Sequence, residues 1–311
     1  MPTETRNEFA WLSGAFTAII TPFSEDSTKV DWQLLRKQLH FQYEPRHNIK
    51  GVNGIVALGT TGESPTITGS EADKIASTCL EIREKTHLKI ILGTGSNNTA
   101  NAAHRQKWAE SLGADATLSV VPYYNKPTQE GIYRHFMTIA DAADIPVILY
   151  NIPGRCGTGM SIETISRLAT HENIVAVKHA TGSVDEAARL HEACPDLILL
   201  SGDDPLTLPL AFAGVTGCIS VLSNILPAEI RELIEVANKK DWLKAEKLNL
   251  QLIQLARGLM SITTNPIGIK TAMKILGYDS GTLRLPMLTA DEKLQLSIRA
   301  LLKQSGFFTQ L

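Results

Sequence analysis

The sequence predicts an α/β fold, a closed (β/α)8 TIM barrel of eight parallel strands with additional C-terminal helices. Short apolar runs rich in β-branched residues recur at intervals of roughly 25 to 35 residues, and helical patterns separate them. Eight such units with right-handed crossovers close into a barrel, whereas an open doubly wound sheet usually stops at about five or six strands.

The eight apolar runs are too short for helices and are bounded by turn residues, which is typical of strands buried on both faces. They comprise residues 16–20, 54–58, 89–93, 117–121, 146–150, 174–178, 197–201 and 217–221. The run "IVAVK" at 174–178 is unusual because it ends in a lysine, and lysine is almost never fully buried without a partner.

Helical patterns between the strands begin at residues that cap helix N-termini. Asp31, Thr68 and Thr128 precede the patterns at 32–43, 69–85 and 129–143, which we expect to be helices.

Amphipathic patterns without a further strand follow the eighth run, in the segments 241–259, 265–276 and 289–304. No linker or low-complexity tract interrupts the chain. We therefore expect a single domain over 1–311, with the barrel core at 14–225 and the last barrel helix and a C-terminal helical extension at 226–311.

The composition favours a small-molecule substrate. A formal net charge of -2 gives no electrostatic reason to expect nucleic acid or an anionic membrane as a partner. The four cysteines are scattered without a C-x-x-C pair, so neither a disulfide framework nor a zinc cluster is indicated. The N-terminal stretch lacks the basic start and apolar run of a signal peptide, and we expect a cytoplasmic protein.

Residues suited to chemistry gather after the C-terminal ends of the predicted strands, where barrel enzymes build their sites. The segments concerned are "GTTGES" (59–64), "GTGSNN" (93–98), "PYYNKP" (122–127), "YNIPGR" (150–155), "KHATG" (178–182) and "SGDD" (201–204). Neither a complete dinucleotide loop nor a phosphate loop is present, and no cofactor or metal is demanded.

Two reactive side chains should meet at this end of the barrel. Because side chains alternate along a strand, Lys178 and Tyr150 both project into the barrel mouth if the small and branched residues face its interior. Burial there lowers the pKa of a lysine and leaves more of the neutral amine, which attacks ketones to form Schiff bases. A nearby tyrosine can carry the protons that this reaction needs.

Each of these residues also has a purely structural interpretation. Lys178 could bend out to solvent or pair with a carboxylate, and Tyr123, Tyr124 and Tyr150 could be aromatics of the rim. Thr60 and Thr61 could cap a turn, Arg155 could lie on the surface, and Glu63 could pair with a neighbour. His179 should face away from the barrel interior, the thiol of Cys156 should be incidental, and Asp203 and Asp204 fit a helix start better than a metal site.

Seven motifs in order resemble one family over nearly the whole chain, from Gly14 to Pro286. They are "GTTGES", "PYYNKP", "YNIPGR", "VKHATG", "SGDD", "GCISV" and "NPIGIKTAMKILG". Together they are similar to the dihydrodipicolinate synthase branch of the class I, Schiff-base-forming pyruvate aldolases, the family that includes N-acetylneuraminate lyase.

The resemblance implies a (β/α)8 barrel that assembles as a homotetramer, a dimer of dimers, and condenses pyruvate with L-aspartate-4-semialdehyde on the diaminopimelate route to lysine. It implies an imine with pyruvate on Lys178 and proton relay by Tyr150, with Thr60 linking Tyr150 to Tyr124 of a neighbouring subunit. It also implies that Thr61 binds the pyruvate carboxylate and that Arg155 holds the carboxylate of the aldehyde substrate, while Gly202 and Ile219 line the pocket.

The sequence does not exclude the activities of sibling enzymes in this family. N-acetylneuraminate lyase and the 2-keto-3-deoxy sugar acid aldolases keep the lysine and the tyrosine of the fifth strand, but the paired threonines of "GTTGE" and Arg155 match the synthase pattern. A non-catalytic barrel that only binds a keto acid would more plausibly have lost Lys178 or Tyr150.

The sequence departs from the family pattern at several positions. His179 follows the lysine where Glu is usual, Cys156 stands where threonine is common, and Gly268 replaces a frequent proline. Lysine-inhibited members hold lysine with a Glu and histidines at the positions matched here by Asn101, Gly69 and Ala72, so we expect weak or absent lysine inhibition.

Overall fold

The computed structural model describes residues 8–46 and 49–310, so part of the N-terminal stretch lies outside the description. Eight strands are hydrogen-bonded in sequence order as a closed barrel, which confirms the predicted (β/α)8 fold. The strands are β1 Ala15–Ala18, β2 Gly54–Ala57, β3 Lys89–Gly93, β4 Ala116–Val120, β5 Val147–Asn151, β6 Ile174–His179, β7 Ile198–Ser201 and β8 Gly217–Ser220.

Burial explains why these runs form strands. Every residue of β1, β2, β5, β6 and β8 is buried, as expected for a parallel sheet covered on both faces. Each predicted run coincides with one of the strands, and the ends differ by two residues at most.

Helices follow the strands along the chain. They are α2 Trp32–Tyr43, α3 Gly69–Arg83, α4 Thr99–Ser111, α5 Gln129–Ala140, α6 Pro153–Cys156, α7 Ile162–Leu168, α8 Val184–Ala193, α9 Thr207–Phe212, α10 Pro227–Asn238, α11 Trp242–Ile262, α12 Ile267–Ile275 and α13 Glu292–Gln304. Short 3-10 turns are η1 Ala10–Leu12, η2 Ser64–Thr66, η3 Asp204–Leu206 and η4 Leu222–Asn224.

The predicted helix starts are confirmed at atomic detail. The side chains of Asp31, Thr68 and Thr128 each accept a hydrogen bond from the backbone N–H three residues later. Thr68 also forms a capping box with Glu71, whose carboxylate accepts from the Thr68 backbone N–H.

By internal contacts the chain divides into two compact units. The first comprises Met1–Ala15 and Lys89–Ile219, and the second comprises Phe16–Leu88 and Ser220–Leu311. The single domain expected from the sequence, with its boundaries at 14–225 and 226–311, stays a prediction.

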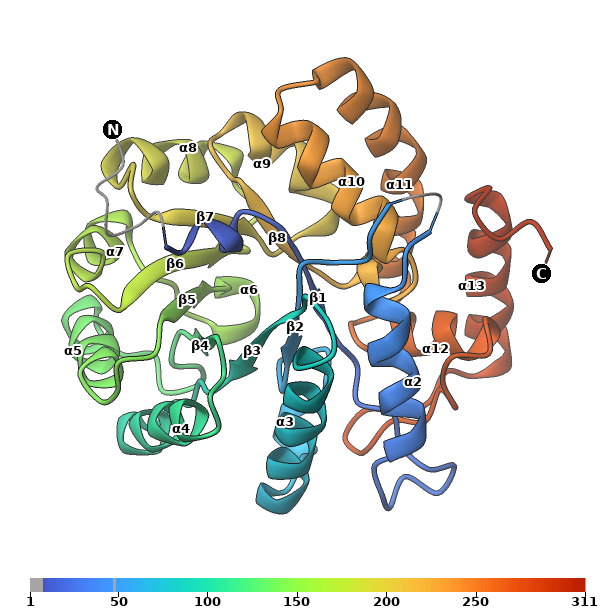
Figure 1. Ribbon diagram of the computed structural model, residues 1–311, viewed down its shortest axis with the longest axis horizontal. Helices are drawn as coiled ribbons and strands as arrows, with labels where there is room; N and C mark the ends of the chain where they lie inside the picture. Colours follow the sequence, from blue (N-terminus) through green and yellow to red (C-terminus); the bar gives the residue numbers. More distant parts are fainter. Residues whose placement is uncertain (1–7, 47–48, 311) are drawn as a thin grey trace. The chain divides into compact units, whose positions relative to one another are not determined.

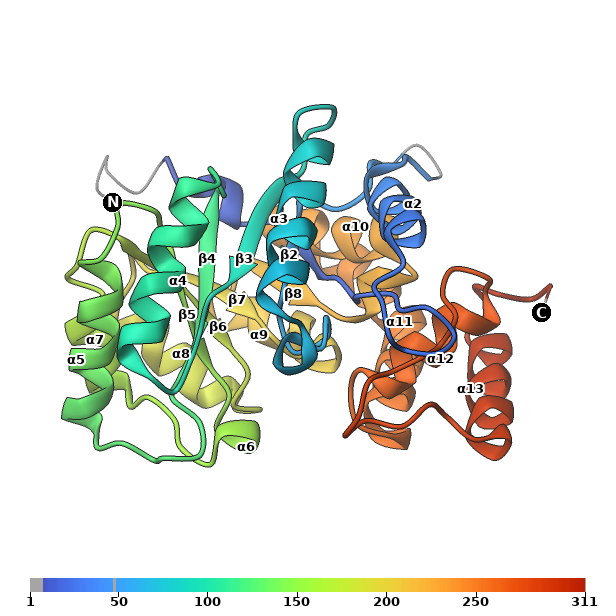
Figure 2. The ribbon, with the colours of Figure 1, turned by 90° about the horizontal axis from the view of Figure 1, so that it is seen from below.

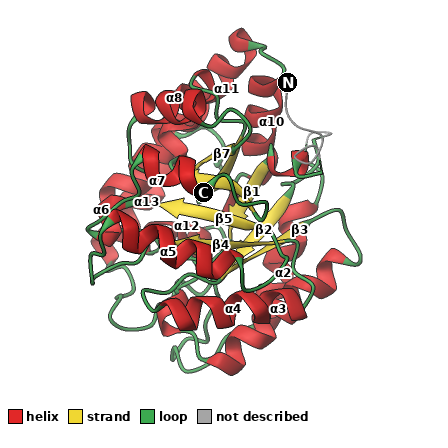
Figure 3. Cartoon of the chain, turned by 90° about the vertical axis from the view of Figure 1, so that its left-hand side faces the viewer, coloured by secondary structure: helices red, strands yellow, loops and turns green. Residues whose placement is uncertain are grey.

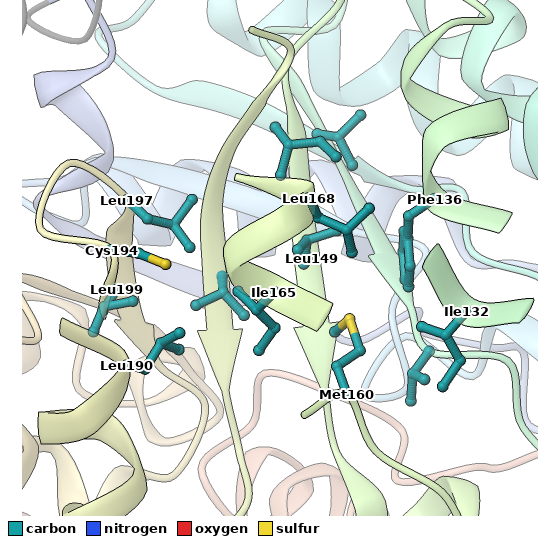
Figure 4. Close-up of a cluster of buried hydrophobic side chains, with 14 of the residues drawn as sticks. Ile132, Phe136, Leu149, Met160, Ile165, Leu168, Leu190, Cys194, Leu197 and Leu199 are labelled. Atoms are coloured by element: carbon teal, nitrogen blue, oxygen red, sulfur yellow. The ribbon is translucent and has the colours of Figure 1, made fainter. Parts of the chain in front are cut away.

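In the first unit, α5 packs beside α4 and α7 (Figure 3), and β5 pairs with β6 (Figure 1). Apolar side chains from α5, α7, β5 and β7 form one buried cluster (Figure 4). Phe136, Leu149 and Leu168 in this cluster are wholly buried. The cluster includes side chains of β5 and β6, the strands that carry the predicted phenol and amine.

In the second unit, α11, α12 and α13 pack against one another (Figure 2). They confirm the amphipathic helices expected after the eighth strand. Across the described part of the chain, no helix is both long and apolar enough to cross a membrane.

Candidate active site

Lys178 and Tyr150 lie side by side on neighbouring strands. The register of β5 and β6 places Tyr150 opposite Lys178, and the lysine Nζ lies 4.2 Å from the centroid of the tyrosine ring. The side-chain alternation predicted this meeting from the sequence. The structure adds that the amine rests over the face of the ring, where a cation is attracted by the ring quadrupole.

The amine of Lys178 is poised for nucleophilic attack. Burial lowers its pKa from 10.5 to about 8, and the positive charge of Arg155 adds to this effect. The negative charge of Asp204 opposes it and is outweighed. A pKa near 8 makes a much larger share of the amine neutral at physiological pH than an exposed lysine would offer.

Tyr150 stays a neutral phenol. Burial raises its pKa above the usual value of 10.0, and Arg155 only partly counteracts this. A phenol that keeps its proton can donate it to a departing oxygen and take one back from a nearby atom, which suits a general acid and base.

Arg155 lies on the short helix α6 directly after β5 and is exposed. Its charge acts on both Lys178 and Tyr150. The structure therefore places the predicted carboxylate-binding arginine where its field reaches the amine and the phenol.

Gly202 follows β7 and donates its backbone N–H to the carbonyl oxygen of His179 at 2.8 Å. A Cβ at this position would lie 2.8 Å from Lys178 Cε and 2.9 Å from Ala180 Cβ. Both distances are below ordinary van der Waals contact, so the absence of a side chain makes room for the lysine. The other predicted lining residue, Ile219, is buried in β8.

The neighbours of the amine and phenol have structural contacts. His179 is buried with Nε2 at 2.9 Å from the carbonyl oxygen of Ser183 and 3.0 Å from Thr181 Oγ1. These contacts with the following loop fit the expectation that His179 faces away from the lysine. Burial raises the pKa of the Cys156 thiol to about 11, so this cysteine is a poor nucleophile.

Tyr124 follows β4 and is among the most exposed aromatic residues of the described chain, with 87% of its surface accessible. Its backbone is in the left-handed region with φ +73°, and its N–H donates to the carbonyl oxygen of Cys156 at 3.4 Å. An exposed phenol on a constrained backbone is compatible with a residue offered to another subunit, and that role stays a prediction.

Thr60 and Thr61 lie in the turn after β2, in the second unit. Thr61 is buried, and its Oγ1 accepts a hydrogen bond from Asn265 Nδ2 at 3.0 Å. Glu63 forms an ion pair with Lys270 at 2.8 Å, which confirms the expectation that Glu63 pairs with a neighbour. Asn265 and Lys270 were not predicted from the sequence as partners of this turn, although both belong to the "NPIGIK" motif.

The aspartates of "SGDD" are placed as expected for a helix start, because Asp204 opens the turn η3. Burial and the charge of Asp204 raise the pKa of Asp203. Within residues 8–46 and 49–310, no group of three or more His, Cys, Asp or Glu side chains is placed to hold a metal ion.

Residues 11–305 match the model of the Dihydrodipicolinate synthetase family. The chain belongs to this family. A 4-hydroxy-tetrahydrodipicolinate synthase from Endomicrobium trichonymphae is 45% identical over 295 residues, which make up 94% of this chain and 98% of that protein.

Solved structures agree with this membership in the dihydrodipicolinate synthetase family. A chloride-inhibited dihydrodipicolinate synthase from Acinetobacter baumannii complexed with pyruvate has a TM-score of 0.91 and 40% identity, covering 96% of this chain and 100% of that one. A Cyanidioschyzon merolae synthase with lysine bound has a TM-score of 0.90 and 37% identity, covering 96% and 99%. The predicted family and enzyme class are confirmed.

Proposed function

We propose that this enzyme condenses pyruvate with L-aspartate-4-semialdehyde to 4-hydroxy-tetrahydrodipicolinate, through an imine on Lys178. One observation carries the proposal: a buried lysine, with its pKa lowered to about 8, contacts a buried tyrosine on the next strand. The synthase names of relatives at 40 to 45% identity support the choice of reaction.

The chemistry follows from a neutral amine next to a protonated phenol. The Lys178 nitrogen attacks the ketone carbon of pyruvate, and loss of water gives the imine. The imine makes the methyl group of pyruvate acidic, and loss of one proton gives an enamine whose carbon attacks the aldehyde. The amino group of the second substrate then attacks the imine carbon, which releases the cyclic product and returns the free amine of Lys178.

Each further role is assigned by the match to the family motifs. Tyr150 passes protons to and from the imine. Its raised pKa keeps the phenol protonated, so that it can donate this proton to a substrate oxygen. The remaining assignments are Thr60 as the link between Tyr150 and Tyr124, Thr61 for the pyruvate carboxylate, Arg155 for the carboxylate of the aldehyde, and Gly202 and Ile219 as lining.

The same proposal includes a cytoplasmic homotetramer built as a dimer of dimers, in which each protomer is a single domain. Tyr124 is then shared across a subunit interface, and catalysis depends on assembly. Sedimentation of the purified protein measures the oligomer directly.

Trapping with borohydride tests the proposed function. Incubation with pyruvate and sodium borohydride should reduce the imine to a stable secondary amine, and peptide mass spectrometry should find the added mass on Lys178. An unmodified Lys178 under these conditions would falsify the imine mechanism.

A comparison of reaction rates separates the synthase from its sibling aldolases. The rate of condensation of pyruvate with aspartate semialdehyde is measured against the rates of cleavage of sialic acid and of 2-keto-3-deoxy sugar acids.

Arg155→Ala should weaken the binding of the second substrate far more than it slows imine formation with the first. A guanidinium that holds a carboxylate by two charge-assisted hydrogen bonds contributes enough binding that KM for aspartate semialdehyde should rise about 10- to 100-fold without it. Borohydride should still trap the pyruvate adduct on Lys178, although loss of the Arg155 charge lets the pKa of the amine rise and slows its attack modestly. Arg155→Lys is the matched control, since it keeps the charge but not the fork and should show an intermediate KM. An unchanged KM in Arg155→Ala would remove this role.

Free lysine should inhibit this enzyme weakly or not at all. An ammonium bound in a protein needs a charge partner, and Asn101 supplies no carboxylate at the position where inhibited members carry Glu. In the structure the amide of Asn101 donates to Ser96 Oγ at 3.3 Å. Initial rates measured over rising lysine concentration check this, and half-inhibition at or below millimolar lysine would contradict it.

A further inference from the structure

The second unit contains another buried lysine, and the proposed chemistry does not use it. Lys270 of α12 has no exposed surface. Its Nζ donates to Glu63 Oε1 at 2.8 Å and to the carbonyl oxygen of Thr21 at 2.9 Å, and it lies 4.3 Å from the centroid of the Phe23 ring. Unlike Lys178, this ammonium has a carboxylate in direct contact.

Glu63 is engaged through both of its carboxylate oxygens. Oε1 accepts from Lys270, and Oε2 accepts from the backbone N–H of Arg284 at 3.0 Å. The guanidinium of Arg284 in turn donates to both oxygens of Glu71, at the start of α3. The carboxylate of Glu63 is therefore held from two segments that follow it by more than 200 residues.

The backbone of Glu63 has an unusual conformation, and it forms the end of the Thr60–Thr61 turn. Glu63 has φ +54°, in the left-handed region, which costs an L-residue of this kind about 1 to 3 kcal/mol unless its surroundings enforce it. The Glu63 N–H donates to the carbonyl oxygen of Thr60 at 3.1 Å, which closes the turn over Thr61 and Gly62. The conformation of the Thr60–Thr61 turn is thus tied to the orientation of Glu63.

Helix α12 and its N-terminal flank hold the same turn at two points. Asn265, two residues before α12, donates to Thr61 Oγ1, and Lys270 within α12 binds Glu63. Thr21 completes the arrangement, since its hydroxyl donates to the carbonyl oxygen of Gly62 at 2.7 Å while its own carbonyl accepts from Lys270. These contacts fix the side chain of Thr61 and the backbone on either side of it.

A buried ion pair of this kind is a poor device for stability alone, because apolar side chains of similar volume often stabilise a core as well or better. Such an ion pair does, however, hold the groups around it in a single geometry. We propose that Glu63 and Lys270 are positioning residues, which hold the Thr60–Thr61 turn in the conformation that binds the carboxylate of pyruvate. This inference rests on the proposed function, since it takes Thr61 as the pyruvate-binding residue.

Glu63→Gln is the first test. Whichever way the new amide turns, its NH2 group faces either the Lys270 ammonium or the Arg284 N–H, so one donor meets another donor. We expect KM for pyruvate to rise about tenfold or more, because small displacements of a positioning group are costly. Uniform loss of binding leaves kcat at saturating pyruvate nearly unchanged, and KM for aspartate semialdehyde should also stay near the wild-type value.

Lys270→Met and the double variant Glu63→Gln/Lys270→Met measure the coupling. If the two residues act as one device, the double variant should raise the pyruvate KM no further than either single variant does. If the two substitutions instead raised the pyruvate KM additively, Glu63 and Lys270 would act independently and the proposal would be overturned. Should Glu63→Gln fail to fold, Arg284→Met provides a second variant. It keeps the backbone N–H to Glu63 and removes the guanidinium, which binds Glu71 and the carbonyl oxygens of Ser27, Thr28 and Thr66. A folded Arg284→Met enzyme with a raised pyruvate KM supports the proposal, and an unchanged KM counts against it.

Two controls separate positioning from general destabilisation. Glu81→Gln makes the same chemical change at an exposed ion pair with Arg36 in the same unit and should change neither KM nor Tm. Leu233→Ala, at a buried position of α10, should lower Tm and leave the pyruvate KM alone.

The outcomes distinguish this inference from the proposed function. A wild-type enzyme without a borohydride adduct on Lys178 removes the function itself. A wild-type adduct, together with a folded Glu63→Gln enzyme of normal pyruvate KM, removes only the positioning role. A pyruvate KM that rises equally in Leu233→Ala would likewise overturn it, because any loss of stability would then explain the effect.

Discussion

Lys178→Met is expected to abolish the pyruvate adduct and reduce condensation to the uncatalysed level, while raising the melting temperature. Methionine is unbranched, fills nearly the same space as the lysine stem and carries no charge. Activity is lost because the nucleophile is gone. Stability is gained because the wild-type fold buries an amine that prefers water when it is protonated.

The sign of the stability effect follows from the pKa of Lys178. Its value falls from 10.5 to about 8 on folding, and at about 1.4 kcal/mol per pKa unit the buried amine costs roughly 3 kcal/mol at pH 7. The unfolded chain binds more protons between pH 8 and 10.5, so wild-type stability rises with pH in that window. The advantage of Lys178→Met should therefore be greatest below pH 8 and fade towards pH 10.5.

Lys270→Met is the matched control, since it makes the same substitution at the other buried lysine of the described chain. It leaves the Glu63 carboxylate buried without its counter-charge, and breaking such a pair costs about 3 to 5 kcal/mol. Thermal melts of the two variants should thus move in opposite directions. A lower melting temperature for Lys178→Met would mean that its surroundings stabilise the ammonium, and a retained adduct would place the imine on another amine.

The sequence predicted the barrel because its strands are short, buried and regularly spaced. Each apolar run became a strand, and the caps at Asp31, Thr68 and Thr128 lie where the side-chain chemistry requires them. These are local signals, which depend on neighbours a few residues away. Strand ends are less sharply encoded, since the last hydrogen bond of a strand depends on the partner strand as well.

The contact between Lys178 and Tyr150 could be predicted because two local rules combine. Alternation along a strand fixes which side chains share a face, and consecutive strands in a barrel are neighbours. The placement of the amine over the ring face could not be predicted, because it depends on side-chain torsions that the surrounding core selects.

The ion pair that holds the Thr60–Thr61 turn could not be predicted from the sequence for a different reason. Glu63 and Lys270 are 207 positions apart, and no local pattern connects two residues at such a distance. A lysine at 270 also fits the polar face of an amphipathic helix, which is its commonest setting. Only the packing of α12 reveals that this lysine points inward to a carboxylate.

Gly202→Ala should give a folded protein whose imine formation with pyruvate is slowed about 100-fold or more. The added methyl group would lie 2.8 Å from Lys178 Cε and 2.9 Å from Ala180 Cβ. Ala180 has no torsion with which to move away, whereas the lysine stem can rotate. The strain is therefore relieved by moving the amine, and that motion displaces the nucleophile.

Gly154→Ala is the matched control for this change. Gly154 lies in α6 of the same unit, and a Cβ there meets no atom within 4 Å, so the lysine should keep its place and imine formation its rate. Stopped-flow or quenched borohydride trapping measures the imine rate in both variants. A normal rate of imine formation in Gly202→Ala would contradict this prediction. The space left by Gly202 would then not determine where the Lys178 amine lies. A slow imine step with an intact fold would tie the reactivity of the amine to the absence of a side chain at Gly202, directly after β7.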